Sequence, residues 1–82
     1  NGMRIGFPEE IKRLRQRSFL TQQDFAEKIG VAFSTVNRWE QSKSKPNLVA
    51  MKNMKTFCDE NDIAYKAIED AWLNYKVGEK EG

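Results

Sequence analysis

Turn-forming residues divide this chain into short segments, and the apolar residues within each segment recur at helical spacing. Gly30, Pro46 and residues 59–62, which read DEND, mark three of the boundaries. Glycine adopts left-handed backbone angles at little cost, and proline cannot continue a helix. No segment alternates convincingly between apolar and polar residues with a period of two. The sequence therefore predicts an all-α fold without strands.

The first half of the chain predicts three helices. Pro8 begins the first, because proline is favoured in the first turn of a helix. Thr21, followed three residues later by Asp24, resembles a capping box at the start of the second helix. Gly30 supplies the left-handed end of that helix. The third helix covers residues 33–40, which read FSTVNRWE and follow after a short turn.

The second half predicts two more helices. Asn47 is a good N-cap for a fourth, and a fifth is expected from about Asp62. Their apolar faces comprise Leu48, Met51, Met54, Phe57 and Cys58 in the fourth, and Ala64, Ala67, Ile68, Ala71, Trp72 and Tyr75 in the fifth. We therefore expect an N-terminal tail over residues 1–7, one domain over residues 8–76 and a flexible C-terminal tail over residues 77–82.

The composition limits the chemistry. The 82 residues, with 39% hydrophobic and 32% charged, suit one small soluble domain. No apolar run approaches the roughly 20 residues that span a bilayer, so we expect a cytoplasmic protein. Cys58 is the single cysteine and there is no histidine, which removes the commonest metal ligand and general base. We expect no metal, no cofactor and no enzymatic activity.

Charge is distributed unevenly along the chain. Residues 1–55 contain eleven Lys or Arg and five Asp or Glu, a balance of +6, whereas residues 56–82 contain three and seven, a balance of −4. A basic segment favours binding of an anionic polymer such as nucleic acid.

The third predicted helix has two different faces. If Phe33 is set at zero, Val36 and Trp39 fall near 300° and 240°, whereas the polar residues lie between about 40° and 140°. The polar residues are Ser34, Asn37, Arg38 and Gln41. Arginine pairs with the guanine edge and asparagine with the adenine edge in the major groove. Two short helices joined by a tight turn describe a helix-turn-helix, although an ordinary solvated helix surface is the alternative interpretation.

Residues 20–47, LTQQDFAEKIGVAFSTVNRWEQSKSKPN, resemble the helix-turn-helix core of the phage repressor and Cro-like (Xre) family. The shared pattern is Leu-Thr-Gln, Phe or Leu before Ala, Gly-Val, Trp-Glu, and a lysine-rich loop before proline. The resemblance implies a five-helix lambda-repressor-like DNA-binding domain with the helix-turn-helix at helices two and three. It also implies a repressor-like transcriptional regulator that binds double-stranded DNA sequence-specifically.

By position, the resemblance also assigns roles to individual residues. Those implied to contact bases are Phe33, Ser34, Asn37 and Arg38. Those implied to contact the DNA backbone are Thr21, Gln22, Thr35, Gln41, Lys43, Ser44 and Lys45. Arg15 and Glu40 are implied to form a structural ion pair. Two residues depart from the family pattern: Ala32 lacks the usual capping side chain, and Ser42 replaces a common glycine, so we expect a loosened helix end and a different turn.

The fifth helix and the biological role leave alternatives open. The helix either folds back over the core or presents Ile68, Trp72 and Tyr75 to a second copy, which would give a homodimer. Instead of a regulator, the chain could be an antitoxin or a protein-interaction module that uses the fifth helix on a protein partner. A further alternative is the DNA-targeting domain of a larger DNA-modifying protein, such as a methyltransferase or a recombinase.

Overall fold

A computed structural model describes residues 6–75, and this part of the chain is helical without strands. The helices are α1 (Phe7–Arg17), α2 (Gln22–Ile29), α3 (Phe33–Glu40), α4 (Leu48–Glu60) and α5 (Lys66–Asn74). The all-α prediction is therefore confirmed. Within the described residues, no helix combines the length and apolar character that a membrane span requires. The predicted C-terminal tail and residues 1–5 of the predicted N-terminal tail lie outside the described residues.

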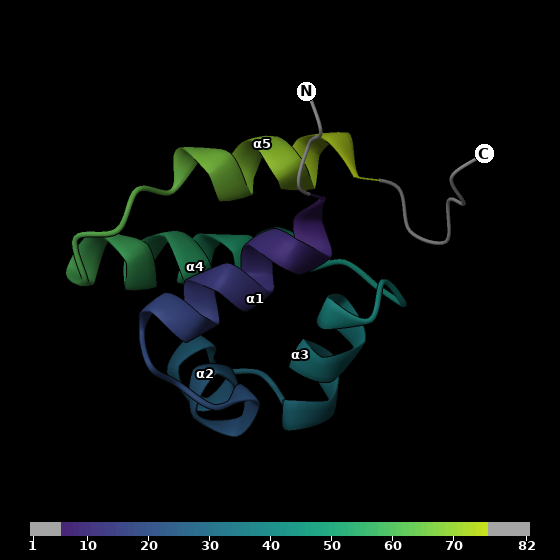
Figure 1. The fold of residues 1–82 in the computed structure, drawn as a ribbon, viewed down its shortest axis with the longest axis horizontal. Coiled ribbons are helices and arrows are strands. Elements are labelled where there is room, and N and C mark those ends of the chain that lie inside the picture. The colour runs from purple at the N-terminus through teal and green to yellow at the C-terminus, as the bar shows by residue number, and fades with distance from the viewer. Residues whose placement is uncertain (1–5, 76–82) are drawn as a thin grey trace.

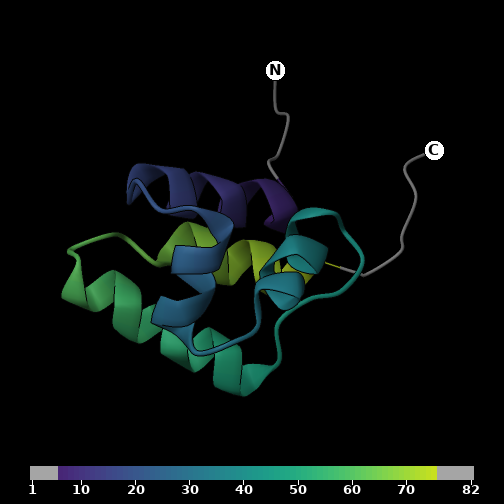
Figure 2. The same cartoon turned by 90° about the horizontal axis from the view of Figure 1, so that it is seen from below.

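The five helices pack so that the helix-turn-helix forms one side of the molecule. In Figure 1, α2 and α3 lie on one side and α5 on the opposite side, with α1 and α4 between them. Figure 2 looks onto the side formed by α2 and α3, where the two short helices are joined by a tight turn. Contacts between α2 and α3, α1 and α3, α2 and α4, and α1 and α5 hold this arrangement.

The predicted start and stop signals of α2 and the predicted start of α4 are present. The Thr21 hydroxyl accepts a hydrogen bond from the Asp24 backbone N–H at 3.1 Å, which begins α2. Gly30 ends α2 with a left-handed φ of 87°. The Asn47 side chain accepts from the Ala50 N–H at 2.9 Å and begins α4. Each of these bonds satisfies a backbone group that a helix end otherwise leaves unpaired.

One hydrophobic core joins all five helices. Its buried members are Phe7, Ile11, Leu14, Phe25, Ala26, Ile29, Val36, Trp39, Ala50, Met51, Met54, Phe57, Cys58 and Ile68. Phe25 of α2 and Phe57 of α4 meet edge to face at 5.7 Å between ring centroids, a favourable aromatic geometry. The short helices are thus stabilised by packing, since helices of this length are marginal alone.

Two apolar residues lie differently from the prediction. Phe7, assigned to the N-terminal tail, is the first residue of α1, is fully buried and lies 6.1 Å from the Tyr75 ring. Leu48, assigned to the inner face of α4, is 73% exposed. Burying a phenylalanine side chain is worth roughly 1.5–3 kcal/mol, which draws Phe7 into the domain. Leu48 lies about 120° around α4 from the centre of its buried face and therefore points to solvent.

The start of α5 also differs from the prediction, at Lys66 instead of Asp62. Asp62 has a φ of 58°, and the Ile63 N–H returns to the Cys58 carbonyl at 2.8 Å, so the chain turns sharply after α4. A residue in the left-handed region cannot continue a right-handed helix. Ala64 consequently lies outside α5, and both Ala64 and Ala67 are exposed where the prediction placed them on the inner face.

Candidate nucleic-acid interface

The two predicted faces of α3 differ in burial. Val36 is fully buried and Trp39 is 2% exposed, so these side chains face the core. On the other side, Ser34 and Arg38 are exposed, and Phe33 at the edge is 50% exposed. Two more polar residues of the helix, Thr35 and Asn37, are half-buried. The helix therefore presents a mixed polar and aromatic surface while its opposite face is anchored in the protein.

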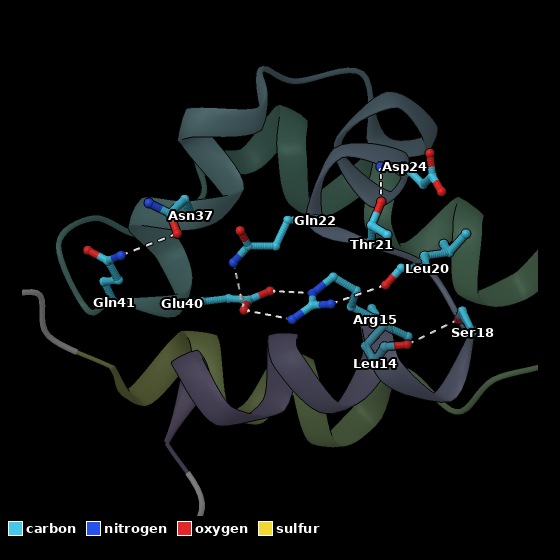
Figure 3. A network of polar contacts seen from close by, with 10 residues as sticks. All are labelled: Leu14, Arg15, Ser18, Leu20, Thr21, Gln22, Asp24, Asn37, Glu40 and Gln41. Atoms are coloured by element: carbon cyan, nitrogen blue, oxygen red, sulfur yellow. Dashed lines mark hydrogen bonds and ion pairs between the residues drawn. The ribbon is translucent and has the colours of Figure 1, made fainter.

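An ion pair ties the C-terminal end of α3 to α1. Arg15 Nε donates to Glu40 Oε2 at 2.8 Å, and a second guanidinium nitrogen donates to Glu40 Oε1 at 3.1 Å (Figure 3). A third nitrogen donates to the Leu20 carbonyl at 3.1 Å. The two side chains are only 14% and 6% exposed. The bond from Arg15 to the Glu40 carboxylate raises the pKa of Arg15, although burial opposes that shift.

Gln22 joins the same carboxylate. Its side-chain amide donates to Glu40 Oε1 at 3.0 Å, so α1, α2 and α3 all meet at Glu40 (Figure 3). The resemblance placed Gln22 against the DNA backbone, but the structure directs its amide group into the protein. Its backbone N–H, in the first turn of α2, has no helical carbonyl to pair with and remains the group suited to a phosphate. Sequence spacing carried no signal for this bond across 18 residues.

Asn37 and Gln41 interact with each other on the exposed side of α3. Gln41 Nε2 donates to Asn37 Oδ1 at 3.2 Å, and Figure 3 shows both side chains away from the Arg15 and Glu40 pair. A carbonyl oxygen has a second lone pair, and the Asn37 amide keeps its own N–H donors. Asn37 therefore retains the donor and acceptor that an adenine edge requires.

Ser42, in the turn after α3, and Ala32, at the start of α3, are the two residues that depart from the family pattern. Ser42 has a φ of 66°, so a serine here adopts the left-handed conformation that favours glycine. Ala32, at the N-cap of α3, makes no side-chain capping bond, as expected for alanine. Lys43 is exposed and Ser44 is half-buried in the loop that follows.

Lys45 is placed differently from the expectation. Its ammonium group donates to the Trp72 carbonyl at 2.8 Å and to the Tyr75 carbonyl at 2.9 Å, and it lies 4.9 Å from the centre of the Trp72 ring. The last carbonyls of a helix lack helical partners and carry partial negative charge, so they attract a cation. Lys45 thus caps the C-terminal end of α5, whereas the resemblance implied a contact to the DNA backbone.

The contacts of Ile68, Trp72 and Tyr75 show how α5 packs against the rest of the protein. Ile68 is 4% exposed, Trp72 Nε1 donates to the Pro46 carbonyl at 2.8 Å, and Tyr75 packs against Phe7. Of the two alternatives, the structure has α5 folded back over its own core. The three side chains suggested for a homodimer or a protein partner all make contacts within their own chain.

A cleft of about 670 Å³ lies away from α3, between the turn that joins α1 to α2, the end of α2 and the second half of α4. Asn53 of α4 donates to the Ile29 carbonyl at 3.1 Å within it. Within residues 6–75, no group of three or more Asp, Glu, Cys or His side chains is placed to hold a metal ion. The polar surface of α3 is therefore the site that the described residues build most completely.

Two short packed helices, with the second one anchored on one face and polar on the other, define a DNA-binding helix-turn-helix domain. The family model described as Helix-turn-helix matches residues 11–54, which is more than half of the chain. The chain belongs to this Xre-like helix-turn-helix family of DNA-binding transcription regulators, which are generally not enzymes.

The chain is also similar to one curated protein, the HTH-type transcriptional activator BcrR of Enterococcus faecalis. The two are 33% identical over 51 residues, which is 62% of this chain and 25% of BcrR. The chain therefore spans about a quarter of the length of this relative. No solved structure matches the chain significantly.

Proposed function

We propose that this chain is the sequence-specific DNA-binding part of a repressor-like transcriptional regulator that acts in the cytoplasm. In this proposal α3 enters the major groove of double-stranded DNA. The observation that carries it is the exposed polar face of α3 on a helix whose end is tied to α1 and α2 at Glu40. A recognition element that is held rigidly before binding loses less freedom on forming the complex.

The base contacts in this proposal come from four side chains of α3. Arg38 is exposed and offers the paired donors that fit guanine O6 and N7. Asn37 keeps the groups that fit adenine N6 and N7. Ser34 accepts or donates, and the half-exposed Phe33 ring suits a thymine methyl group.

The backbone contacts surround this face. Thr21 and the backbone N–H of Gln22 lie at the N-terminus of α2, where a helix favours an anion. Four further residues, in α3 and the following loop, complete the proposed set: Thr35, Gln41, Lys43 and Ser44. These contacts set the orientation of the helix on the duplex, while the base contacts supply the discrimination.

Selection of bound duplexes from a random pool, followed by titration of Arg38→Ala, tests the proposal. We expect Arg38→Ala to weaken binding to the selected duplex by about 1–3 kcal/mol and to relax preference at one base pair. Arg13→Ala is the matched control, because Arg13 is an exposed arginine of α1 beside α5. The proposal fails if the wild-type chain enriches no sequence, or if Arg38→Ala and Arg13→Ala have equal effects.

A further inference from the structure

The loop between α3 and α4 is connected to the last turn of α5 by bonds in both directions. Lys45 of the loop donates to the Trp72 and Tyr75 carbonyls at 2.8 and 2.9 Å. In return, Trp72 Nε1 donates to the carbonyl of Pro46, the next residue of the loop, at 2.8 Å. We name Lys45, Pro46, Trp72 and Tyr75 the α5 latch.

The latch engages most of what Lys45 can offer. A lysine ammonium group has three donors, and two of them are used by carbonyls within 3 Å. The Trp72 ring face, 4.9 Å away, adds a cation–π contact. Moving this ammonium group to a phosphate would leave two carbonyls and the ring without their cation. The geometry therefore favours a structural position for Lys45.

Besides the burial of Pro46, few backbone hydrogen bonds hold the loop at this point. The Lys43 N–H bonds to the Arg38 carbonyl at 2.9 Å, but among residues 6–75 the N–H groups of Ser44 and Lys45 donate to no backbone carbonyl. The next local restraint is the Asn47 cap of α4. The α5 latch, together with the burial of Pro46, thus restrains the segment that directly follows Lys43 and Ser44.

We infer that Lys45 and Trp72 are positioning residues for DNA binding: the α5 latch holds the loop so that Lys43 and Ser44 lie along the DNA backbone. This inference rests on the proposed function. It makes α5 part of the DNA-binding apparatus, although the helix lies on the side of the molecule opposite α2 and α3 (Figure 1). A small displacement of positioned groups is sufficient to weaken several phosphate contacts together.

Trp72→Phe in the full 82-residue chain tests the inference without changing any charge. The variant keeps an aromatic ring but removes the donor to the Pro46 carbonyl. We expect measurably weaker binding to the duplex selected by the wild-type chain, by no more than about fivefold, because one internal hydrogen bond contributes about 1 kcal/mol to holding the loop in place. Unchanged affinity in Trp72→Phe would overturn the inference.

Tyr65→Phe is the matched control for a merely structural effect. It also removes a donor to a backbone carbonyl, because the Tyr65 hydroxyl donates to the Met51 carbonyl at 2.9 Å, but it does so away from the loop. Melting curves establish that each variant is folded at the binding temperature. We expect Tyr65→Phe to bind DNA as the wild type does, and equal losses in both variants would contradict a positioning role.

Double substitutions separate positioning from direct contact. If the α5 latch acts through Lys43, then Lys45→Met weakens binding in the wild-type chain but has little further effect in a Lys43→Met chain. If Lys45 itself neutralises a phosphate, the two losses add, and each lowers the salt dependence of log K by about 0.9. Additive losses overturn the inference while leaving the proposed function intact. Failure of the wild-type chain to bind any duplex would instead remove the proposed function, and the inference with it.

Discussion

Arg15 of α1 and Glu40 of α3 form a bidentate ion pair, with donor to acceptor distances of 2.8 and 3.1 Å. The side-chain amide of Gln22 in α2 donates to the same carboxylate. Parallel bonds between a guanidinium and a carboxylate define the relative orientation of the two groups. The pair therefore defines where the end of α3 lies relative to α1 and α2, and so the direction in which its exposed face points.

Arg15→Ala is expected to lower the free energy of unfolding by about 3 kcal/mol, because it leaves the buried Glu40 carboxylate without its cation. Urea denaturation measures the change. Arg13→Ala removes the same charge from an exposed position of the same helix and is expected to change stability by less than about 0.5 kcal/mol. Similar midpoints for the two variants would show that the ion pair does not hold α3.

Ala32→Thr is expected to stabilise the protein by about 0.5–1 kcal/mol. The backbone of Ala32 has the extended angles of an N-cap, φ −74° and ψ 153°, but its side chain has no oxygen to accept a bond from α3. Ala32→Val, which has the shape of threonine without the hydroxyl, is the control and is expected to bring no gain. Thermal melting compares the two, and equal melting temperatures would contradict the capping explanation.

Ser42→Gly is expected to raise stability modestly, by up to about 1 kcal/mol. Ser42 is exposed and has a φ of 66°, so glycine relieves backbone strain without loss of packing, although its greater freedom in the unfolded chain offsets part of the gain. Ser42→Ala keeps a Cβ and is expected to bring no gain. A loss of stability in Ser42→Gly beyond that in Ser42→Ala would mean that the turn is not strained.

The stability of the protein is expected to fall at alkaline pH. Burial, aided by the charge of Asp59, raises the pKa of the Cys58 thiol from its ordinary value of 9.0 to about 11. Between these values the unfolded chain has released the proton and the folded chain keeps it, so stability is fully present below pH 9 and decreases as pH rises towards 11. Burial likewise raises the pKa of Tyr65 from 10.0 to about 12, which extends the decrease.

Cys58→Ala isolates the thiol contribution, because it removes the titrating group from the core. Urea unfolding between pH 8 and pH 11 is expected to give a shallower decline for Cys58→Ala than for the wild type, with Tyr65 still contributing. The slope is compared, since alanine also lowers stability at every pH by removing core volume. Parallel curves for the two proteins would contradict the assignment to Cys58.

The helix starts at Thr21 and Asn47 and the two faces of α3 were predictable from the sequence, because they depend on residues within one or two turns. A capping oxygen needs a backbone N–H three residues away, and burial of Val36 and Trp39 follows from their spacing. The Arg15 and Glu40 pair, separated by 25 residues, was anticipated from the family resemblance and not from spacing.

The family resemblance assigned Lys45 and Gln22 to the DNA backbone, and the packing of the helices directs both side chains elsewhere. Lys45 reaches the end of α5, 27 and 30 residues along the chain, and Gln22 reaches Glu40 across 18 residues. A long polar side chain bonds to an unpaired group that the fold brings within its reach. Because that group lies far away along the chain, the local spacing of residues does not predict the bond. The burial of Phe7 and the course of α5 were decided in the same way, because a small chain must collect apolar surface from distant segments to build a core. The sequence by itself determined the number of helices and which side of α3 is polar, because both depend on local spacing. Only the tertiary structure decided where α5 begins and which polar side chains point away from solvent, because these depend on groups that lie far apart along the chain.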